Sequence, residues 1–117
     1  MSYDIHLLDP VTKKVIEFDE PHQLRGGTYQ VGGSREAWIN VTYNYSKHIG
    51  RVLPGGIRSI YGKTGAESIP LLEAAAVQLS DEVDPDYWTP TEGNVKRALY
   101  QILALARIRP DGVWDGD

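Results

Sequence analysis

Hydrophobic and polar positions follow a period of two in the first part of the chain and a helical period in the second. Residues 3–8 and 14–18 are rich in β-forming side chains, and the intervening Asp9-Pro10 favours a turn, so the sequence predicts a β-hairpin. Residues 19–33 contain four glycines and one proline, a composition typical of a loop, with space for a brief strand at 28–31.

Residues 37–45 show the clearest alternation in the chain. A period of two sends one set of side chains to one face of a sheet: Ile39, Val41, Tyr43 and Tyr45. The opposite face then carries Trp38, Asn40, Thr42 and Asn44. A helical template also fits the residues that recur at steps of four and three: Trp38, Thr42, Tyr45, Ile49 and Val52. We prefer a strand, because β-branched and aromatic residues dominate the segment.

From residue 46 onward the spacing of apolar residues becomes helical. Ser46 is placed to cap a short helix over 46–53, and residues 57–61 form a short turn or strand. The next segment, 68–79, is predicted as a helix with Ser68 as its N-cap, since a proline follows in the first turn and leucines and alanines share one face.

A further helix start is indicated by Thr89-Pro90-Thr91-Glu92, which matches a capping box with Thr89 as the cap. The apolar stripe that follows predicts a helix to about Arg107. The tail 110–117 either adds an edge strand carrying Val113 and Trp114 or stays loose, and both alternatives are open.

These elements predict an α+β fold. A small antiparallel sheet from the N-terminal half is expected to pack against two main helices from the C-terminal half. We expect a single domain over 1–117, strand-rich over 1–45, helix-rich over 46–109 and closed by a short tail over 110–117. The composition, 41% hydrophobic and 24% charged, is typical of globular proteins and argues against wholesale disorder.

The chain contains no cysteine, which excludes disulfides, thiol nucleophiles and thiolate metal sites and fits a reducing compartment. Its first residues have neither the basic region nor the apolar region of a secretory signal. The longest apolar-rich stretch, 98–106, is too short to span a bilayer. We therefore expect a cytoplasmic protein that does not contact a membrane.

The net charge is −4, which argues against binding to duplex nucleic acid, because that binding depends on clustered lysine and arginine. Acidic residues gather at 81–86 and at 111–117. Residues 47–63 carry no acid and hold Lys47, Arg51, Arg58 and Lys63. A local anion site therefore remains compatible with the acidic balance of the whole chain.

Several catalytic motifs are incomplete. Gly62-Lys63-Thr64 ends like a phosphate-binding loop, but Ile57 stands where that motif requires its first glycine. The three histidines lack the spacing of a metal site, and we expect neither a metal nor another cofactor. Glu67 and Glu92 each open a predicted helix, where an acid normally stabilises the helix dipole and the first N–H groups rather than catalyses.

The polar strand face combines an aromatic plate with amides and a hydroxyl, the mixture found in small-molecule sites. Its members Trp38, Asn40, Thr42 and Asn44 are candidate ligand contacts, although a solvated outer sheet face has a similar composition. Trp88 is a further candidate, because it adjoins a helix N-terminus that could bind an anion. The alternative for Trp88 is that it covers one end of the core. Candidate cations for a phosphate are Arg25, Arg51 and Arg58.

Five segments carry a resemblance to a known family: Asn40-Val41-Thr42-Tyr43-Asn44, Gly56-Ile57-Arg58, the stretch from Ile69 to Leu79, Trp88 to Glu92, and Pro110-Asp111-Gly112-Val113. Over most of its length the chain resembles an uncharacterised group of small proteins carried by tailed phages, prophages and their bacterial hosts. Closer relatives share the segment 25–29 and the ending 114–117. The resemblance implies a phage or prophage accessory gene, and hence the host cytoplasm, but it implies no residue roles.

Small acidic proteins in that setting often act by binding. We expect a non-enzymatic protein that sequesters a small polar, nucleotide-like ligand such as a host-defence signal. The alternative is an inhibitor that binds a host defence protein directly through its acidic surface, at 81–86 and 111–117. A third hypothesis is a small hydrolase that uses Glu67, Glu92 or His48. The ligand, the host target and the formation of a homo-oligomer stay open.

Overall fold

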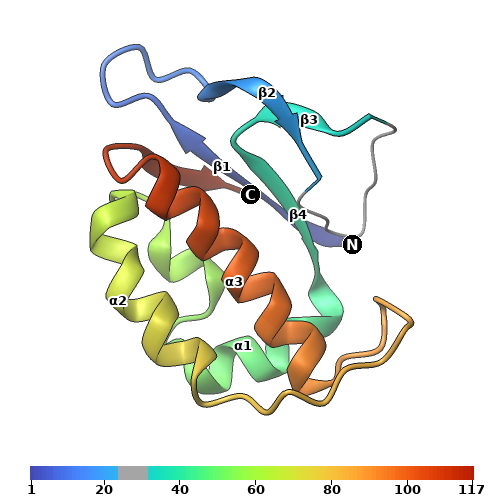
Figure 1. Cartoon of the computed structure of the whole chain (residues 1–117). Helices are drawn as coiled ribbons and strands as arrows, with labels where there is room; N and C mark the ends of the chain where they lie inside the picture. The colour runs from blue at the N-terminus through green and yellow to red at the C-terminus, as the bar shows by residue number, and fades with distance from the viewer. Residues whose placement is uncertain (24–31) are drawn as a thin grey trace.

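A computed structural model describes residues 1–23 and 32–117 (Figure 1). The brief strand expected at 28–31 and the candidate Arg25 lie outside the described residues. The order of the elements is β1 (Ser2–Leu8), β2 (Glu17–His22), β3 (Ser34–Glu36), β4 (Trp38–Thr42), η1 (Tyr43–Tyr45), α1 (Ser46–Val52), η2 (Ile57–Ile60), α2 (Gly65–Ala76), α3 (Glu92–Ile108) and β5 (Val113–Gly116). The predicted α+β class is confirmed. None of the described helices is long and apolar enough to cross a membrane.

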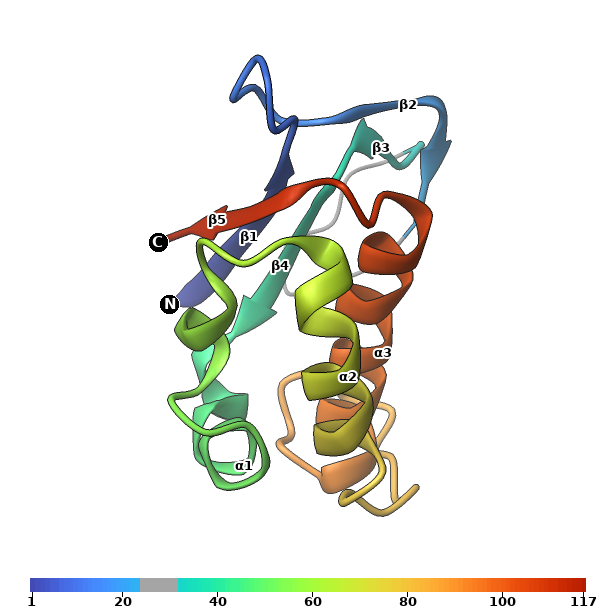
Figure 2. The ribbon, with the colours of Figure 1, turned by 90° about the vertical axis from the view of Figure 1, so that its left-hand side faces the viewer.

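The main sheet has three antiparallel strands in the order β4-β1-β5. Central β1 places Ile5 opposite Ile39 of β4 on one side and Gly116 of β5 on the other. The tail therefore supplies an edge strand, and Trp114 on β5 is buried, 1% exposed. Figure 2 shows β5 crossing beside β1, with the helices on one side of the sheet.

The predicted N-terminal hairpin is only partly present. Asp9 Oδ1 accepts the N–H groups of Val11 and Thr12, which closes a tight turn, and Leu8 forms an isolated bridge with Val15. Ile16 also donates its N–H to the Leu7 carbonyl oxygen at 3.0 Å, and from Glu17 onward the chain pairs as β2 with β3 instead of β1. The expected strand 14–18 therefore meets β1 at residues 15 and 16 and is wrong from Glu17 onward, because β4 takes that edge of β1 over Ser2–His6.

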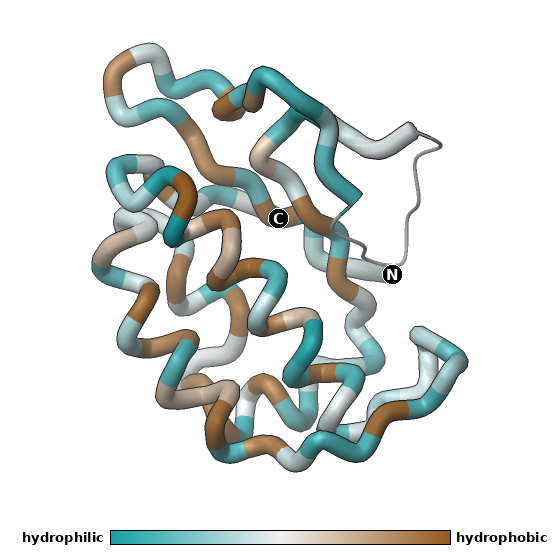
Figure 3. Tube along the Cα trace, viewed as in Figure 1, coloured by the Kyte–Doolittle hydropathy of each residue, from teal (hydrophilic) through white to brown (hydrophobic). Residues whose placement is uncertain are grey.

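The strands β2 and β3 form a separate two-stranded sheet. Its residues are mostly hydrophilic, shown as teal segments in Figure 3, and β2 has no fully buried residue. Phe18 and His22 of β2 border a shallow groove with Leu105 and Ile108 of α3. This small sheet therefore lies beside the C-terminal part of α3.

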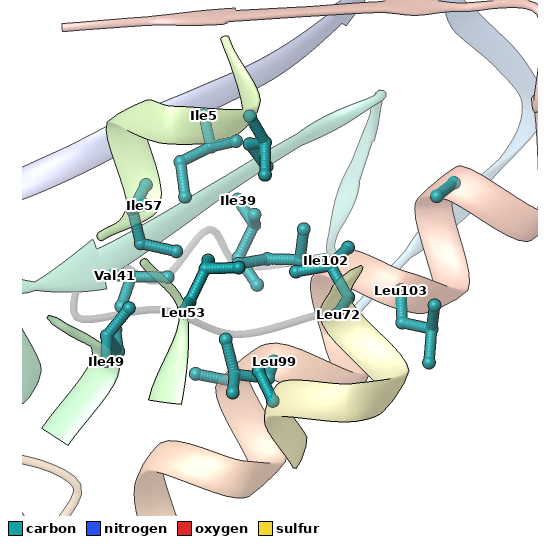
Figure 4. Close-up of a cluster of buried hydrophobic side chains, with 14 of the residues drawn as sticks. Ile5, Ile39, Val41, Ile49, Leu53, Ile57, Leu72, Leu99, Ile102 and Leu103 are labelled. Atoms are coloured by element: carbon teal, nitrogen blue, oxygen red, sulfur yellow. The ribbon is translucent and has the colours of Figure 1, made fainter. Parts of the chain in front are cut away.

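The core lies between the main sheet and the helices. Figure 4 shows Ile5 and Ile39 from the sheet facing Leu99 and Ile102 of α3, with Leu72 of α2 beside them. These side chains are 0% exposed. Burying one such aliphatic side chain contributes roughly 1.5–3 kcal/mol, so their alternation along β1 and β4 fixes which sheet face meets the helices.

Both main helices begin at different residues from those expected. Thr64 caps α2: its Oγ1 accepts the Glu67 N–H at 3.1 Å, and Glu67 Oε1 accepts the Thr64 N–H at 2.9 Å. Ser68 is thus inside the helix, where its Oγ accepts the Trp114 indole N–H at 2.8 Å. Ser68 was a plausible cap by sequence, but the reciprocal capping box lies four residues earlier.

The last helix α3 is capped by Thr91, whose Oγ1 accepts the Asn94 N–H at 3.2 Å. The expected capping box with Thr89 is therefore wrong by two residues. Ser46 likewise does not cap α1, because a 3-10 turn over 43–45 runs directly into that helix. Residues 57–60 form a second 3-10 turn, which agrees with the turn alternative.

Candidate functional site

The polar strand expected at 37–45 ends early. β4 stops at Thr42, and the next three residues coil into a 3-10 helix, so the alternation of faces stops there. Ile39 and Val41 are buried in the core, as expected for the inner face. The expectation that Asn44 continues the outer strand face is wrong, because a helical turn rotates each residue by about 120° rather than 180°.

Trp38 and Asn40 lie on the outer face of the sheet, beside Asp4 of β1. The Trp38 indole N–H donates to Asp4 Oδ1 at 3.1 Å, and Asn40 Nδ2 donates to the same oxygen at 3.0 Å. Asn40 Nδ2 also donates to Ser2 Oγ at 2.6 Å. Asn40 is only 3% exposed and Trp38 is half-buried. These donors tie β4 to β1, and their role as ligand contacts stays a prediction.

Thr42 ends β4, four residues or roughly 13 Å from Trp38, and Asn44 follows it in η1. The Thr42 N–H donates to the Tyr87 hydroxyl at 3.0 Å. Asn44 Nδ2 donates to the Trp88 carbonyl oxygen at 3.0 Å. The structure thus brings the candidates Thr42, Asn44 and Trp88 together and separates them from Trp38.

The two described candidate cations lie on helical segments that follow β4. Arg51 of α1 has Nη2 3.0 Å from His48 Nδ1 and 3.5 Å from Glu92 Oε2. Arg58 of η2 donates from Nη2 to the Tyr43 hydroxyl at 3.1 Å. Both guanidinium groups already have partners, and neither is on the sheet face that carries Trp38.

A pocket of about 360 Å³ opens where η1 meets α3 and the loop over 77–91. Figure 1 shows this loop in gold and orange, running from α2 below α1 and past the end of β4. The lining includes Asp84, Asp86, Tyr87, Trp88, Arg97 and Gln101. Its volume lies within the range of small-molecule sites, about 300–1,000 Å³.

Asn94 fixes the loop against the first turn of α3. Its Nδ2 donates to the carbonyl oxygens of Asp86 at 3.1 Å and Thr89 at 2.9 Å, and its Oδ1 accepts the Asp84 N–H at 3.1 Å. Asn94 is 4% exposed, so these bonds are shielded from competing water. One side chain therefore holds three backbone groups of the pocket wall in place.

Gly93 allows the loop to approach α3 closely. Its N–H donates to the Glu82 carbonyl oxygen at 2.7 Å. A Cβ at this position would collide with that carbonyl group. A glycine is therefore required here by close approach of two backbones rather than by an unusual φ.

Three aromatic side chains form one wall of the pocket. The Tyr45 and Tyr87 rings lie 5.3 Å apart, and Trp88 packs edge-to-face on Tyr87 at 5.0 Å. The Tyr45 hydroxyl donates to the Tyr87 carbonyl oxygen, and burial raises the pKa of Tyr45 well above its ordinary value. Tyr45 is therefore a neutral structural donor, whereas Trp88 is 48% exposed and leaves ring surface open.

Arg97 is the cation of the pocket. Its side chain is exposed, and within residues 1–23 and 32–117 it makes no hydrogen bond and no ion pair. Asp86 lines the same pocket, but its oxygens accept the Trp88 N–H at 3.1 Å and the Thr89 hydroxyl at 3.3 Å. Asp84 Oδ1 accepts the Asp86 N–H at 2.8 Å. The carboxylates build the loop, and the guanidinium stays available to a ligand.

Among the sequence candidates that the structure describes, only Trp88 lines this pocket, and Asn44 bonds to its backbone. Sequence reasoning missed Asn94, Arg97 and Gln101. The sequence did contain a signal for Arg97. This charged residue lies outside the apolar stripe of the helix that follows Tyr87-Trp88, so its side chain is expected to face solvent near those rings.

Other chemical motifs are used by the fold. In the segment resembling a phosphate loop, the Gly62 N–H donates to the Trp114 carbonyl oxygen, and the Lys63 carbonyl oxygen accepts the Trp114 N–H. Glu67 belongs to a capping box, and Glu92 Oε1 accepts the Ser80 N–H at 2.9 Å. In the part of the chain that the structure describes, no three acidic or histidine side chains are grouped to hold a metal ion.

Comparison of the chain with protein-family models, with curated protein sequences and with solved structures found no match in any of the three. The resemblance to phage and prophage proteins therefore stays a prediction. A function for this chain has to be inferred from the chemistry of its pocket.

Proposed function

We propose that this chain is a non-enzymatic binding protein that holds a small polar, nucleotide-like ligand in the pocket between α3 and the loop over 77–91. The observation that carries the proposal is that Arg97, a guanidinium without a described partner, lines the same pocket as the exposed ring of Trp88. A planar ring with an attached anionic group matches that pair, since aromatic faces stack bases and guanidinium groups bind phosphate oxygens.

The ligand would fit the pocket in a defined orientation. Its ring would lie against Trp88, the half-exposed amide of Gln101 would meet its polar edge, and its anionic group would reach Arg97. Binding rather than catalysis is favoured because the Asp84 and Asp86 carboxylates accept hydrogen bonds from the loop backbone and thereby serve the structure of the pocket wall.

The resemblance to phage and prophage proteins would make this ligand a host-defence signal, sequestered in the host cytoplasm. Sequestration requires tight binding and return of the ligand unchanged. A bound nucleotide recovered intact after denaturation of the protein would distinguish this function from that of a small hydrolase.

The test is a thermal-shift screen with nucleosides, mononucleotides, cyclic dinucleotides and ADP-ribose derivatives, followed by titration calorimetry. A ligand at a thousandfold excess over its Kd stabilises the fold by about 4 kcal/mol. Arg97→Gln should weaken binding at least tenfold. The matched control is Arg107→Gln on the same helix, because Arg107 pairs with Glu73 at 2.9 Å and does not line the pocket. No shift with any nucleotide, or equal effects of both variants, would refute the proposal.

A second function, inhibition of a host protein through an acidic surface, is favoured by the exposure of the loop over 77–91. The Asp81 side chain is 91% exposed, and Glu82 is exposed beside it. Reversing these two charges with Asp81→Lys and Glu82→Lys leaves the Asn94 hydrogen bonds in place. Loss of biological activity in this double variant, with nucleotide binding unchanged, would support the inhibitor over the ligand-binding protein.

A further inference from the structure

A second hollow lies on the exposed side of α3, next to the pocket. It is a shallow groove of about 410 Å³ lined by Val83, Lys96, Tyr100 and Ala104, among others. The groove and the pocket share Arg97 and Gln101 in their linings. The two hollows are therefore neighbours on one surface, and Arg97 lies between them.

The helical spacing of α3 explains this continuity. Arg97, Gln101 and Ala104 follow each other at steps of four and three, so their side chains lie along one face of the helix. Tyr100, three residues after Arg97, adjoins the same row. A ligand that extends from the pocket along α3 to the Tyr100 ring passes the two shared residues, Arg97 and Gln101.

The two hollows differ in chemical character. The pocket presents amides, carboxylates and the Trp88 ring, whereas the groove is lined mainly by apolar atoms of Val83, Tyr100 and Ala104. Tyr100 is 43% exposed and Val83 is 53% exposed. Exposed aromatic surface next to a binding pocket offers a stacking position for a second planar ring.

The charges limit the group that can lie between the two rings. Lys96 is neutralised by Asp81, whose Oδ1 lies 2.8 Å from Nζ, so Arg97 remains the available cation among the described lining residues. Asp84 and Asp86 add negative charge on the pocket side. The described linings thus offer one unpaired cation against two carboxylates, which favours a ligand with no more than one negative charge, held at Arg97.

We propose that the ligand contains two planar ring systems joined by a linker with one negative charge, the chemistry of a dinucleoside monophosphate. The first ring occupies the pocket beside Trp88, the linker contacts Arg97, and the second ring stacks on Tyr100. This inference rests on the proposed function and adds the ligand class to it.

The probes are four dinucleoside monophosphates, each with the same base at both positions, and the four corresponding nucleoside methyl phosphates. The two series carry the same single charge and differ only by the second nucleoside. Stacking of one base on an aromatic side chain is worth roughly 5- to 150-fold in affinity. Titration calorimetry on the full chain should show that advantage for the best dinucleoside monophosphate.

Tyr100→Ala should abolish the advantage and leave the affinity for the nucleoside methyl phosphate unchanged. Ile108→Ala is the control, because Ile108 is 59% exposed on the same helix and lines neither hollow. Equal affinity of both series for the native protein would overturn this inference while the proposed function stands. A Tyr100→Ala variant that weakens both series equally would overturn it as well. Binding of neither series would overturn the inference, and the proposed function fails with it only if the thermal-shift screen also finds no nucleotide ligand.

Discussion

Replacing Asn94 with alanine removes the side chain that holds the loop over 77–91 against α3. Three hydrogen bonds are lost, to the backbone of Asp84, Asp86 and Thr89. Each bond contributes about 0.5–1.5 kcal/mol if water can hydrogen-bond to the freed backbone groups in the variant. Water can reach them there, because the loop is partly exposed. The free energy of unfolding should therefore fall by about 2–4 kcal/mol.

Urea denaturation measures that loss, and amide hydrogen exchange locates it. The Asp84 N–H should lose its protection in Asn94→Ala. It should keep its protection in Asn94→Asp, which retains an acceptor but cannot donate to the carbonyl oxygens of Asp86 and Thr89. Asn44→Ala is the control, since it removes one exposed bond to this loop and should cost below about 1 kcal/mol. A loss below about 1 kcal/mol for Asn94→Ala, with unchanged exchange, would show that Asn94 does not fix the loop.

Two further predictions concern the sheet and the helix caps. Trp38→Ala should lower the free energy of unfolding by about 1–2 kcal/mol, because Trp38 is half-buried. Trp114→Ala should lower it by about 3–5 kcal/mol, because Trp114 is 1% exposed. Equal losses of stability in thermal melts would contradict this difference. Hydrogen bonds from the backbone and side chain of Thr64 hold the pKa of Glu67 below its ordinary value of 4.5. The ionised Glu67 carboxylate therefore stabilises the fold above pH 4.5, and this contribution is lost as the pH falls through the pKa of the folded state. Glu67→Gln should make the free energy of unfolding fall less steeply with decreasing pH in the acid range. An unchanged pH dependence would refute the capping role.

Much of the candidate site could not be predicted from the sequence. Trp88 was recognisable as an aromatic residue beside a helix start, and the alternation at Ile39 and Val41 identified the inner face of β4. The hydrogen bonds of Asn94 join residues five to ten positions apart through an irregular loop, and no periodic pattern records such contacts. The partnership of Trp38 with Asp4 likewise depends on the pairing of β4 with β1.

The helix boundaries illustrate a similar limit at short range. Both Thr64 and Ser68 precede a run with helical spacing, and both Thr89 and Thr91 have the chemistry of a cap. The choice of Thr64 follows from its reciprocal bonds with Glu67, and Ser68 is instead used by the Trp114 indole. Competing caps of similar intrinsic strength are separated by the tertiary contacts that each can make.

The sequence by itself determined the α+β class, the existence of β1, β4 and the two main helices, and the inner face of β4, because each depends on hydrophobic periodicity within one segment. The tertiary structure decided that β5 rather than β2 pairs with β1, that β4 ends at Thr42, and that Arg97 and Trp88 line one pocket. Strand partners and site geometry depend on contacts between segments far apart in the chain. Their free energy is gained only when the whole core closes, so no local pattern can specify them.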